Sequence, residues 1–343
     1  MPLIIQAAED KSWRVRICLS RNFTLIAANF GKEVTDMSLI QTFGNLLKDS
    51  EVDVKIEAVK HLSEFAKIIS PEKVSVLVPQ VIALGKDQLA IVRSYMGGVL
   101  TNILPFIAKD QIYQAIQPLI KDLMKDDNQE VRKGGILAAA KLVEVLGPES
   151  MPSIEANLKT SLEDPKWRVR LEAVKALINL ALKMKNPELF KKLEPLITSY
   201  LKDRASAIRV AAIERIQELV KVYGSAWVNT FIERLGDILS KDPCFHFKLA
   251  AIYTIREIIY ANDQYLEKGL NLIFQSSSES VPNVREACVK AERDIASKFG
   301  KVKDQVKKHL SSMVEDSDFE VRNSATHALE VLWDDLIPLI CLN

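Results

Sequence analysis

A repeat of about 38 residues, present in nine copies, constrains the fold of this chain more than any other feature of its sequence. Each copy carries an acidic residue and, six positions later, a basic residue that follows an apolar one. The basic residues recur every 37 to 39 positions, at Arg16, Lys55, Arg93, Arg132, Arg170, Arg209, Lys248, Arg285 and Arg322. The acidic residues are Asp10, Asp49, Asp87, Asp126, Asp164, Asp203, Asp242, Glu279 and Asp316. A period of this length is typical of α-helical solenoids.

The periodicity within one copy is helical. Residues 39–49 are predicted to form a first helix, and residues 55–69 are predicted to form a second helix after a short turn. The apolar residues of the second helix fall on one stripe: Ala58, Val59, Leu62, Phe65 and Ala66. A helix pair of this kind cannot bury its apolar faces alone and must stack on its neighbours. The sequence therefore predicts an all-α fold, an α-α superhelix of about nine helix pairs in a single domain over residues 1–343. The second helices are expected to begin near residues 13, 52, 90, 129, 167, 206, 245, 282 and 319.

Small residues and prolines fit this arrangement. A small residue recurs three positions after the basic one, as at Gly135, which is expected to let adjacent helices approach closely. Pro79, Pro118 and Pro195 are predicted to lie early in first helices, where a missing N–H group is harmless. Pro282 is likewise expected at the start of a second helix.

The repeated acid and base have a structural interpretation. We expect the base of one repeat to contact the acid of its neighbour, which forms a ladder that sets the stacking register. Half-exposed ion pairs of this kind contribute about 0.5–1 kcal/mol each. Arg16 and Arg170 are therefore interpreted as parts of the scaffold.

The tetrapeptide Trp-Arg-Val-Arg occurs twice, and its tryptophans need a separate explanation. Trp13 and Trp167 lie in the turn three positions before the basic residue, where a ladder requires no indole. Two interpretations stay open: these side chains anchor a protein partner, since aromatic residues dominate interface energies, or they pack against an adjacent turn. Arg14 and Arg168 lie outside the ladder series and are candidate partners of the two indoles.

Composition excludes several classes of function. The net charge is +1, and each ladder base is matched by an acid, so no nucleic-acid-binding stripe is expected. No stretch approaches the length of a membrane span, and the N-terminus lacks the pattern of a signal peptide. The four cysteines share no metal-ligand spacing and fit a reducing compartment: Cys18, Cys244, Cys288 and Cys341. We expect a cytoplasmic protein, with the nucleus as an alternative.

No catalytic constellation is visible in the sequence. The histidines lie in different repeats, and no metalloprotease, nucleophile-elbow or phosphate-loop motif is present: His61, His246, His309 and His327. The acids recur periodically, which favours an architectural role. We expect no enzymatic activity and no cofactor or metal.

Several segments together resemble a known family. The period and the turn pattern resemble HEAT repeats. In combination, "QAAEDKSWRVR" (6–16), "FGKEVT" (30–35), "KWRVRLEAV" (166–174) and "VYGSAWVNTFIERL" (222–235) resemble the scaffolding A subunit of protein phosphatase 2A. The resemblance covers nearly the whole chain and corresponds to the last nine repeats of a longer scaffold. It implies a non-catalytic scaffold that binds a phosphatase catalytic subunit and helps to position a regulatory B-type subunit.

The resemblance also implies site residues. In the family, turns of the C-terminal repeats hold the catalytic subunit; here these positions are Trp167, Arg168, Phe245, Val281, Asn283, Asp318 and Phe319. N-terminal repeats hold regulatory subunits, which makes Trp13 and Arg14 possible contacts. The chain departs from the family at Ser206, where the family has a tyrosine, and in the turn "CFHFK" (244–248).

Three alternatives stay open from the sequence. The chain is either a fragment that lacks N-terminal repeats or a shortened relative that recruits regulators differently. The apolar tail at residues 334–343 either caps the last repeat or docks on a partner. The competing function is that of another HEAT-repeat adaptor or a nuclear transport receptor, although such receptors are expected to have more varied repeat lengths and acidic insertions.

Overall fold

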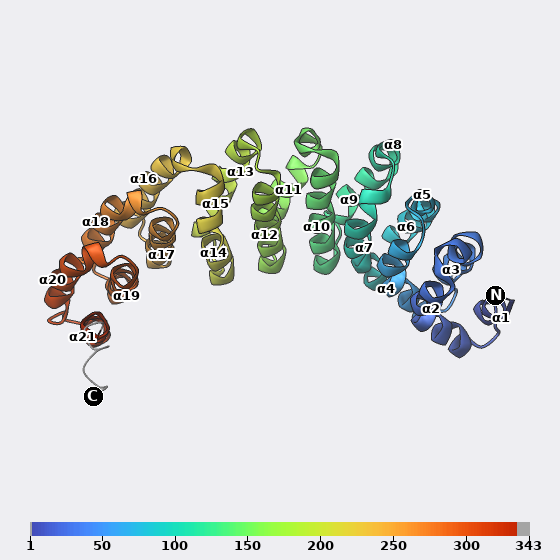
Figure 1. The fold of residues 1–343 in the computed structure, drawn as a ribbon, viewed down its shortest axis with the longest axis horizontal. Coiled ribbons are helices and arrows are strands. Elements are labelled where there is room, and N and C mark those ends of the chain that lie inside the picture. The colour runs from blue at the N-terminus through green and yellow to red at the C-terminus, as the bar shows by residue number, and fades with distance from the viewer. Residues whose placement is uncertain (1, 335–343) are drawn as a thin grey trace, which may run out of the picture. The chain divides into compact units, whose positions relative to one another are not determined.

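The computed structural model describes residues 2–334, and these residues form helices and turns without a β-strand. They divide into two compact units, Met1–Met184 and Lys185–Asn343, each built of stacked helix pairs (Figure 1). The predicted all-α superhelical fold class is thus confirmed. The continuity of all nine pairs in a single domain stays a prediction. The apolar tail beyond residue 334 lies outside the described residues.

The second helices of the repeats begin at the positions expected from the repeat register. In the first unit they are α2 (Trp13–Val34), α4 (Val52–Ile68), α7 (Ala90–Ile103), α10 (Gln129–Leu146) and α12 (Trp167–Met184). In the second unit they are α14 (Ser206–Ile213) with α15 (Ile216–Tyr223), α17 (Phe245–Ala261), α19 (Pro282–Lys298) and α21 (Phe319–Asp334). Within each unit, consecutive second helices contact each other along their length.

Most of the first helices are shorter or more interrupted than the second helices, although α16 is as long as α17. In the first unit they are α1 (Pro2–Ala8), α3 (Ile40–Leu46), α5 (Pro71–Val74) with α6 (Val78–Gly85), α8 (Lys109–Gln111) with α9 (Gln117–Leu123), and α11 (Glu155–Leu162). In the second unit they are α13 (Pro187–Ser199), α16 (Ser225–Lys241), α18 (Leu266–Ser276) and α20 (Lys303–Met313). Short 3₁₀ or π segments adjoin them: η1 (Thr35–Leu39), η2 (Ser75–Leu77), η3 (Leu104–Phe106), η4 (Ile112–Ile116), η5 (Pro148–Ser153), η6 (Tyr200–Lys202), η7 (Asp263–Tyr265) and η8 (Gly300–Val302).

Proline explains part of this irregularity. Pro79 and Pro118 each lie in the first turn of the helix that follows a 3₁₀ or π segment. Because proline has no N–H group to donate to the fourth residue before it, a regular α-helical hydrogen bond is lost at that point. Pro282 starts α19, as predicted. The prediction for Pro195 was wrong: it lies inside α13, near the C-terminal end of that helix.

An apolar core runs between the paired helices of the first unit. Phe23, Phe43 and Phe65, from α2, α3 and α4, are all fully buried. Their ring centroids lie 5.0 Å, 5.7 Å and 4.2 Å apart, within the range of favourable aromatic contacts. The predicted stripe of α4 is buried throughout. A Cβ atom on Gly135 would lie 2.7 Å from the Met124 backbone nitrogen, so the predicted close approach is also confirmed.

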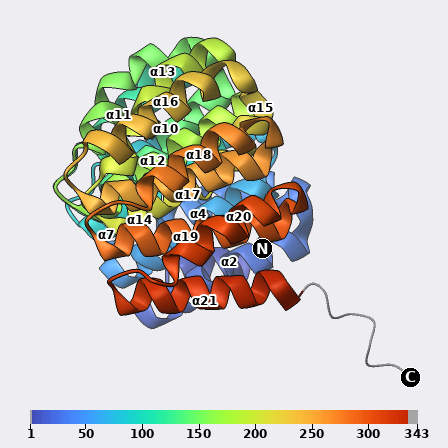
Figure 2. The same cartoon turned by 90° about the vertical axis from the view of Figure 1, so that its left-hand side faces the viewer.

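The second unit repeats this organisation. Figure 2 shows α21 lying beside α19 and α20, and these three helices are in contact. A buried polar cluster lies in this part of the unit. The carboxylate of Glu292 is fully buried, 2.8 Å from Nδ1 of His309, and accepts a longer hydrogen bond from Ser277. Burial raises the pKa of Glu292, and the contact with His309 only partly offsets that increase.

The predicted ladder is present within each unit. Arg16 Nε and NH2 donate to the two carboxylate oxygens of Asp49 at 2.7 Å and 3.0 Å, and its NH1 donates to the Asp10 carbonyl oxygen at 2.6 Å. The base therefore ties the turn of its own repeat to the turn of the next. The equivalent pairs are Lys55–Asp87, Arg93–Asp126, Arg132–Asp164, Lys248–Glu279 and Arg285–Asp316.

The ladder pairs are more buried than the sequence suggested. Only 14% of the Arg16 side chain and 6% of the Asp49 side chain are exposed, where half-exposed pairs were expected. Burial by itself raises the pKa of Asp49, but hydrogen bonds from Arg16 and from the Glu51 N–H group outweigh this effect and lower it. The same backbone contact, two residues along, recurs at the other aspartates of the series. Asp49 therefore caps its own turn as well as binding the base of the preceding repeat.

Candidate protein-interaction surface

The two Trp-Arg pairs adopt the same local geometry at the start of α2 and α12. The guanidinium carbon of Arg14 lies 4.8 Å from the centre of the Trp13 ring, and that of Arg168 lies 4.6 Å from the centre of the Trp167 ring. The predicted partnership between arginine and indole is therefore confirmed as a cation–π contact. Trp167 is 39% exposed, whereas Trp13 is less exposed.

This geometry suits Trp167 to contact with another protein. A tryptophan held by a stacked arginine loses little further freedom on binding, and it presents both apolar area and a charged group. The alternative, packing against an adjacent turn, stays open for Trp13. The surface around Trp13 includes an apolar hollow of about 450 Å³ lined by Arg14, Val15, Cys18 and Ile26, among others.

The remaining predicted site residues belong to the second unit and lie in turns at the starts of second helices. Phe245 begins α17 and is half-buried, with its ring against that of His246 at 3.9 Å. Val281 precedes α19 and is half-buried, whereas Asn283 is exposed. Phe319 begins α21 and is 65% exposed.

Asp318 has a structural task that the sequence comparison did not indicate. Its Oδ1 atom accepts hydrogen bonds from the backbone N–H groups of Glu320 at 3.0 Å and Val321 at 3.3 Å. These are the otherwise unsatisfied donors of the first turn of α21. A partner contact by Asp318 would have to use its other carboxylate oxygen.

Within residues 2–334, no group of three or more His, Cys, Asp or Glu side chains could hold a metal ion. The thiol of Cys288 is buried, and burial raises its pKa, which disfavours the reactive thiolate. None of the helices in that part of the chain has both the length and the apolar character needed to cross a membrane.

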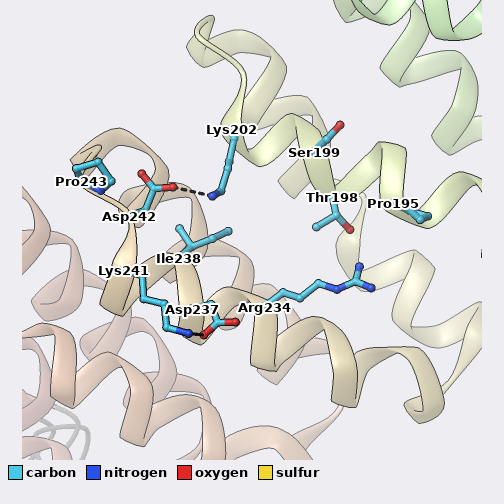
Figure 3. A pocket seen from close by; sticks show the side chains of 10 residues that line it. All are labelled: Pro195, Thr198, Ser199, Lys202, Arg234, Asp237, Ile238, Lys241, Asp242 and Pro243. Carbon is cyan, nitrogen blue, oxygen red and sulfur yellow. Dashed lines mark hydrogen bonds and ion pairs between the residues drawn. The ribbon is translucent and has the colours of Figure 1, made fainter.

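One feature of the surface was missed by the sequence reasoning. A groove of about 610 Å³ lies between α13 and α16, and Lys202, Arg234 and Lys241 line it (Figure 3). Lysine also precedes the ladder acid in other repeats, as at Lys48 and Lys86, so the position of Lys202 carries no distinguishing signal. The groove depends on how two first helices diverge, which the repeat pattern does not encode.

Two family models of helical repeats match parts of the chain. A family model described as PPP2R1A-like HEAT repeat matches residues 32–107, and one described as IPO5-like, TPR repeats, matches residues 99–222. Each covers less than half of the chain. A search of curated proteins finds no significant match.

Solved structures align with this chain at low sequence identity. The crystal structure of importin beta aligns with a TM-score of 0.67 and 10% identity over 96% of this chain. This chain spans only 44% of the importin beta chain. An engineered protein aligns with a TM-score of 0.45 and 17% identity, over 96% of this chain and 88% of its own. The chain thus shares an all-α superhelical fold with importin beta, and its residues 32–107 are similar to PPP2R1A-like HEAT repeats.

Proposed function

We propose that this chain is a non-catalytic scaffold of a protein phosphatase 2A holoenzyme. It binds the catalytic subunit through turns of its later repeats and helps to position a regulatory B-type subunit, in the cytoplasm or the nucleus. The observation that carries the proposal is the match of residues 32–107 to PPP2R1A-like HEAT repeats. The resemblance to the phosphatase scaffold extends well beyond that match and covers nearly the whole chain.

The site residues support this function through their chemistry. Trp167 with Arg168 on one unit, and Phe245 and Phe319 on the other, present aromatic surface at the starts of second helices. Val281 and Asn283 occupy the equivalent turn before α19 and at its start. Aromatic residues at a protein surface are among the residue types that most often dominate binding energy.

The sharpest test compares the two Trp-Arg pairs. Replacing Trp167 by alanine is expected to weaken binding of the phosphatase catalytic subunit by about 2 kcal/mol, the usual cost of losing an interface anchor. Trp13→Ala is the matched control, because it removes the same cation–π contact from the same position of another repeat. Titration calorimetry with the purified catalytic subunit measures both. Equal losses of affinity in the two variants would mean that the binding site for the catalytic subunit has been assigned to the wrong repeats.

A further variant uses the departure from the family. Ser206, exposed at the first position of α14, replaces the family's tyrosine. Ser206→Tyr is expected to tighten binding of the catalytic subunit by restoring an aromatic side chain. A weaker complex would mean that this turn has a different role here.

The second candidate is a HEAT-repeat adaptor or a transport receptor. The IPO5-like match over residues 99–222 and the fold shared with importin beta favour it. The same calorimetry separates the two functions. If the unaltered chain shows no affinity for the phosphatase catalytic subunit, the scaffold proposal fails and the adaptor function remains.

A further inference from the structure

The ladder contains one exchanged pair, within the second unit. Asp242 is the ladder acid that corresponds to Arg209, as Asp316 corresponds to Arg285. Instead, Asp242 accepts a hydrogen bond from Nζ of Lys202 at 2.6 Å. No carboxylate in residues 2–334 forms an ion pair with Arg209.

Arg209 is nevertheless held in the ladder conformation. Its NH1 group donates to the carbonyl oxygens of Asp203 and Arg204 at 2.8 Å and 3.2 Å. The equivalent NH1 of Arg285 makes the same two contacts, and its Nε and NH2 then bind Asp316 at 2.8 Å and 2.7 Å. Arg209 therefore keeps its corresponding two donors available for a carboxylate.

Asp242 is in turn held within its own turn. Its Oδ1 accepts a hydrogen bond from the Cys244 N–H group at 3.0 Å, as the other ladder aspartates do two residues along. Its side chain is only 12% exposed, whereas that of Lys202 is 47% exposed. The second helix of this repeat is also divided, into α14 and α15, unlike the second helices of the next two repeats, α17 and α19.

The groove gives a ligand access to this pair. Figure 3 shows Lys202 reaching Asp242 beside the groove, with Ile238 below and Pro195 and Pro243 on opposite sides. The other two cations of the groove have settled partners. Arg234 binds Glu194 at 2.9 Å, and Lys241 binds Asp237 at 2.6 Å.

Lys202 therefore differs from the other groove cations, because its partner Asp242 corresponds by ladder position to a second cation, Arg209. An incoming carboxylate on Lys202 would release Asp242 to Arg209, and no charge would be left unpaired. The same exchange would supply the missing ladder contact between the turns before α14 and α17. We propose that this groove binds an acidic segment of a partner protein. A carboxylate of this segment forms an ion pair with Lys202, and Asp242 then pairs with Arg209 instead.

The occupant is a peptide segment because the groove offers more than charge. Its volume of about 610 Å³ exceeds the needs of one small anion, and Pro195, Ile238 and Pro243 add apolar surface. A segment that alternates acidic and apolar side chains uses both features. The site adjoins the turn of Phe245, but the proposal does not depend on the phosphatase function.

The test uses the whole chain and a fluorescein-labelled peptide of alternating glutamate and leucine. Fluorescence anisotropy is expected to show binding that weakens as salt concentration rises, and weaker binding of a peptide with glutamine in place of glutamate. Lys202→Gln is expected to weaken binding about tenfold, the loss of one charge-assisted hydrogen bond. Lys241→Gln is the matched control, since this groove cation pairs with Asp237 on its own helix and takes no part in the ladder, and it is expected to leave affinity within about twofold.

Hydrogen exchange of residues 206–223 tests the transfer itself. Peptide binding is expected to slow exchange in the unaltered chain but not in Arg209→Gln. Lys202→Gln is expected to slow it without peptide, because Asp242 is then released to Arg209. Equal affinity for the glutamate and glutamine peptides would refute the site. Unchanged or faster exchange in Lys202→Gln would refute the transfer of Asp242.

Discussion

Two adjacent glycines of α7 are expected to respond in opposite ways to the same substitution. Gly98 is exposed, and nothing lies within 4 Å of a Cβ atom built on it. Gly97 is buried against α10, and a Cβ atom there would lie 2.2 Å from the Cα atom of Gly134 and 2.6 Å from its carbonyl oxygen. These neighbours are backbone atoms, so no rotamer change can relieve the contact.

The magnitudes follow from two opposing effects. Alanine in place of an exposed helical glycine stabilises by about 0.5–1 kcal/mol, because the unfolded chain loses conformational freedom. Gly98→Ala should show this gain alone. Gly97→Ala should show the same gain set against the cost of overpacking, roughly 1–3 kcal/mol, because α7 and α10 must separate by more than an ångström. Separation would also strain the pair between Arg93 and Asp126 at this junction.

Gly134→Ala supplies an intermediate case. Its Cβ atom would lie 3.1 Å from the Gly97 Cα atom, a tight contact that a small shift relieves. Urea unfolding followed by circular dichroism, with hydrogen exchange of α7 and α10, should rank the variants. The expected order of stability is Gly98→Ala above the unaltered chain, then Gly134→Ala, then Gly97→Ala. Equal stabilisation by Gly97→Ala and Gly98→Ala would refute the close helix contact.

The repeat architecture was predictable because it rests on periodic chemistry. Asp49 and Arg16 recur with a fixed separation, and each side chain satisfies backbone groups of its own turn as well as its neighbour. Because the pattern occurs in nine copies, its register can be recognised even where a single copy deviates from it. The starts of second helices follow from the same register.

The exceptions were not predictable from the repeat pattern, because they depend on how side chains and helices of adjacent repeats are placed in space. The repeat register pairs Asp242 with Arg209, and only the structure shows that Asp242 binds Lys202 instead. Pro195 was misplaced because α13 already begins at Pro187, a start that the repeat pattern does not indicate. The depth of the ladder pairs was also underestimated, because burial is set by the stacking of whole helices. At the candidate interface, the sequence placed the Trp-Arg contact correctly, but only the structure showed that Asp318 caps α21.

The remaining predictions concern the charged groups of the interior. Arg285→Ala, which leaves the mostly buried Asp316 without its partner, is expected to cost about 1.5–3 kcal/mol in urea unfolding, and Lys308→Ala on the exposed surface should cost little. A hydrogen bond from Arg285 lowers the pKa of Asp316, so its contribution to stability is present above the ordinary aspartate pKa and is lost as pH falls through the folded-state value. Unfolding midpoints measured between pH 3 and pH 6 should therefore fall less steeply in Asp316→Asn, and parallel curves would contradict this. The contribution of Glu292 to stability should depend on pH in the opposite direction. Burial raises its pKa, so the stability it contributes is present at low pH and is lost as pH rises through the folded-state value. Glu292→Gln keeps a side-chain oxygen that can accept a hydrogen bond from His309 but removes the buried charge, so its stability relative to the unaltered chain should increase with pH. Glu286→Gln is the control, since this half-buried residue on the same helix pairs with Lys290 at the surface. A Glu292→Gln variant that loses relative stability as pH rises would show that the ionised pair with His309 stabilises the fold.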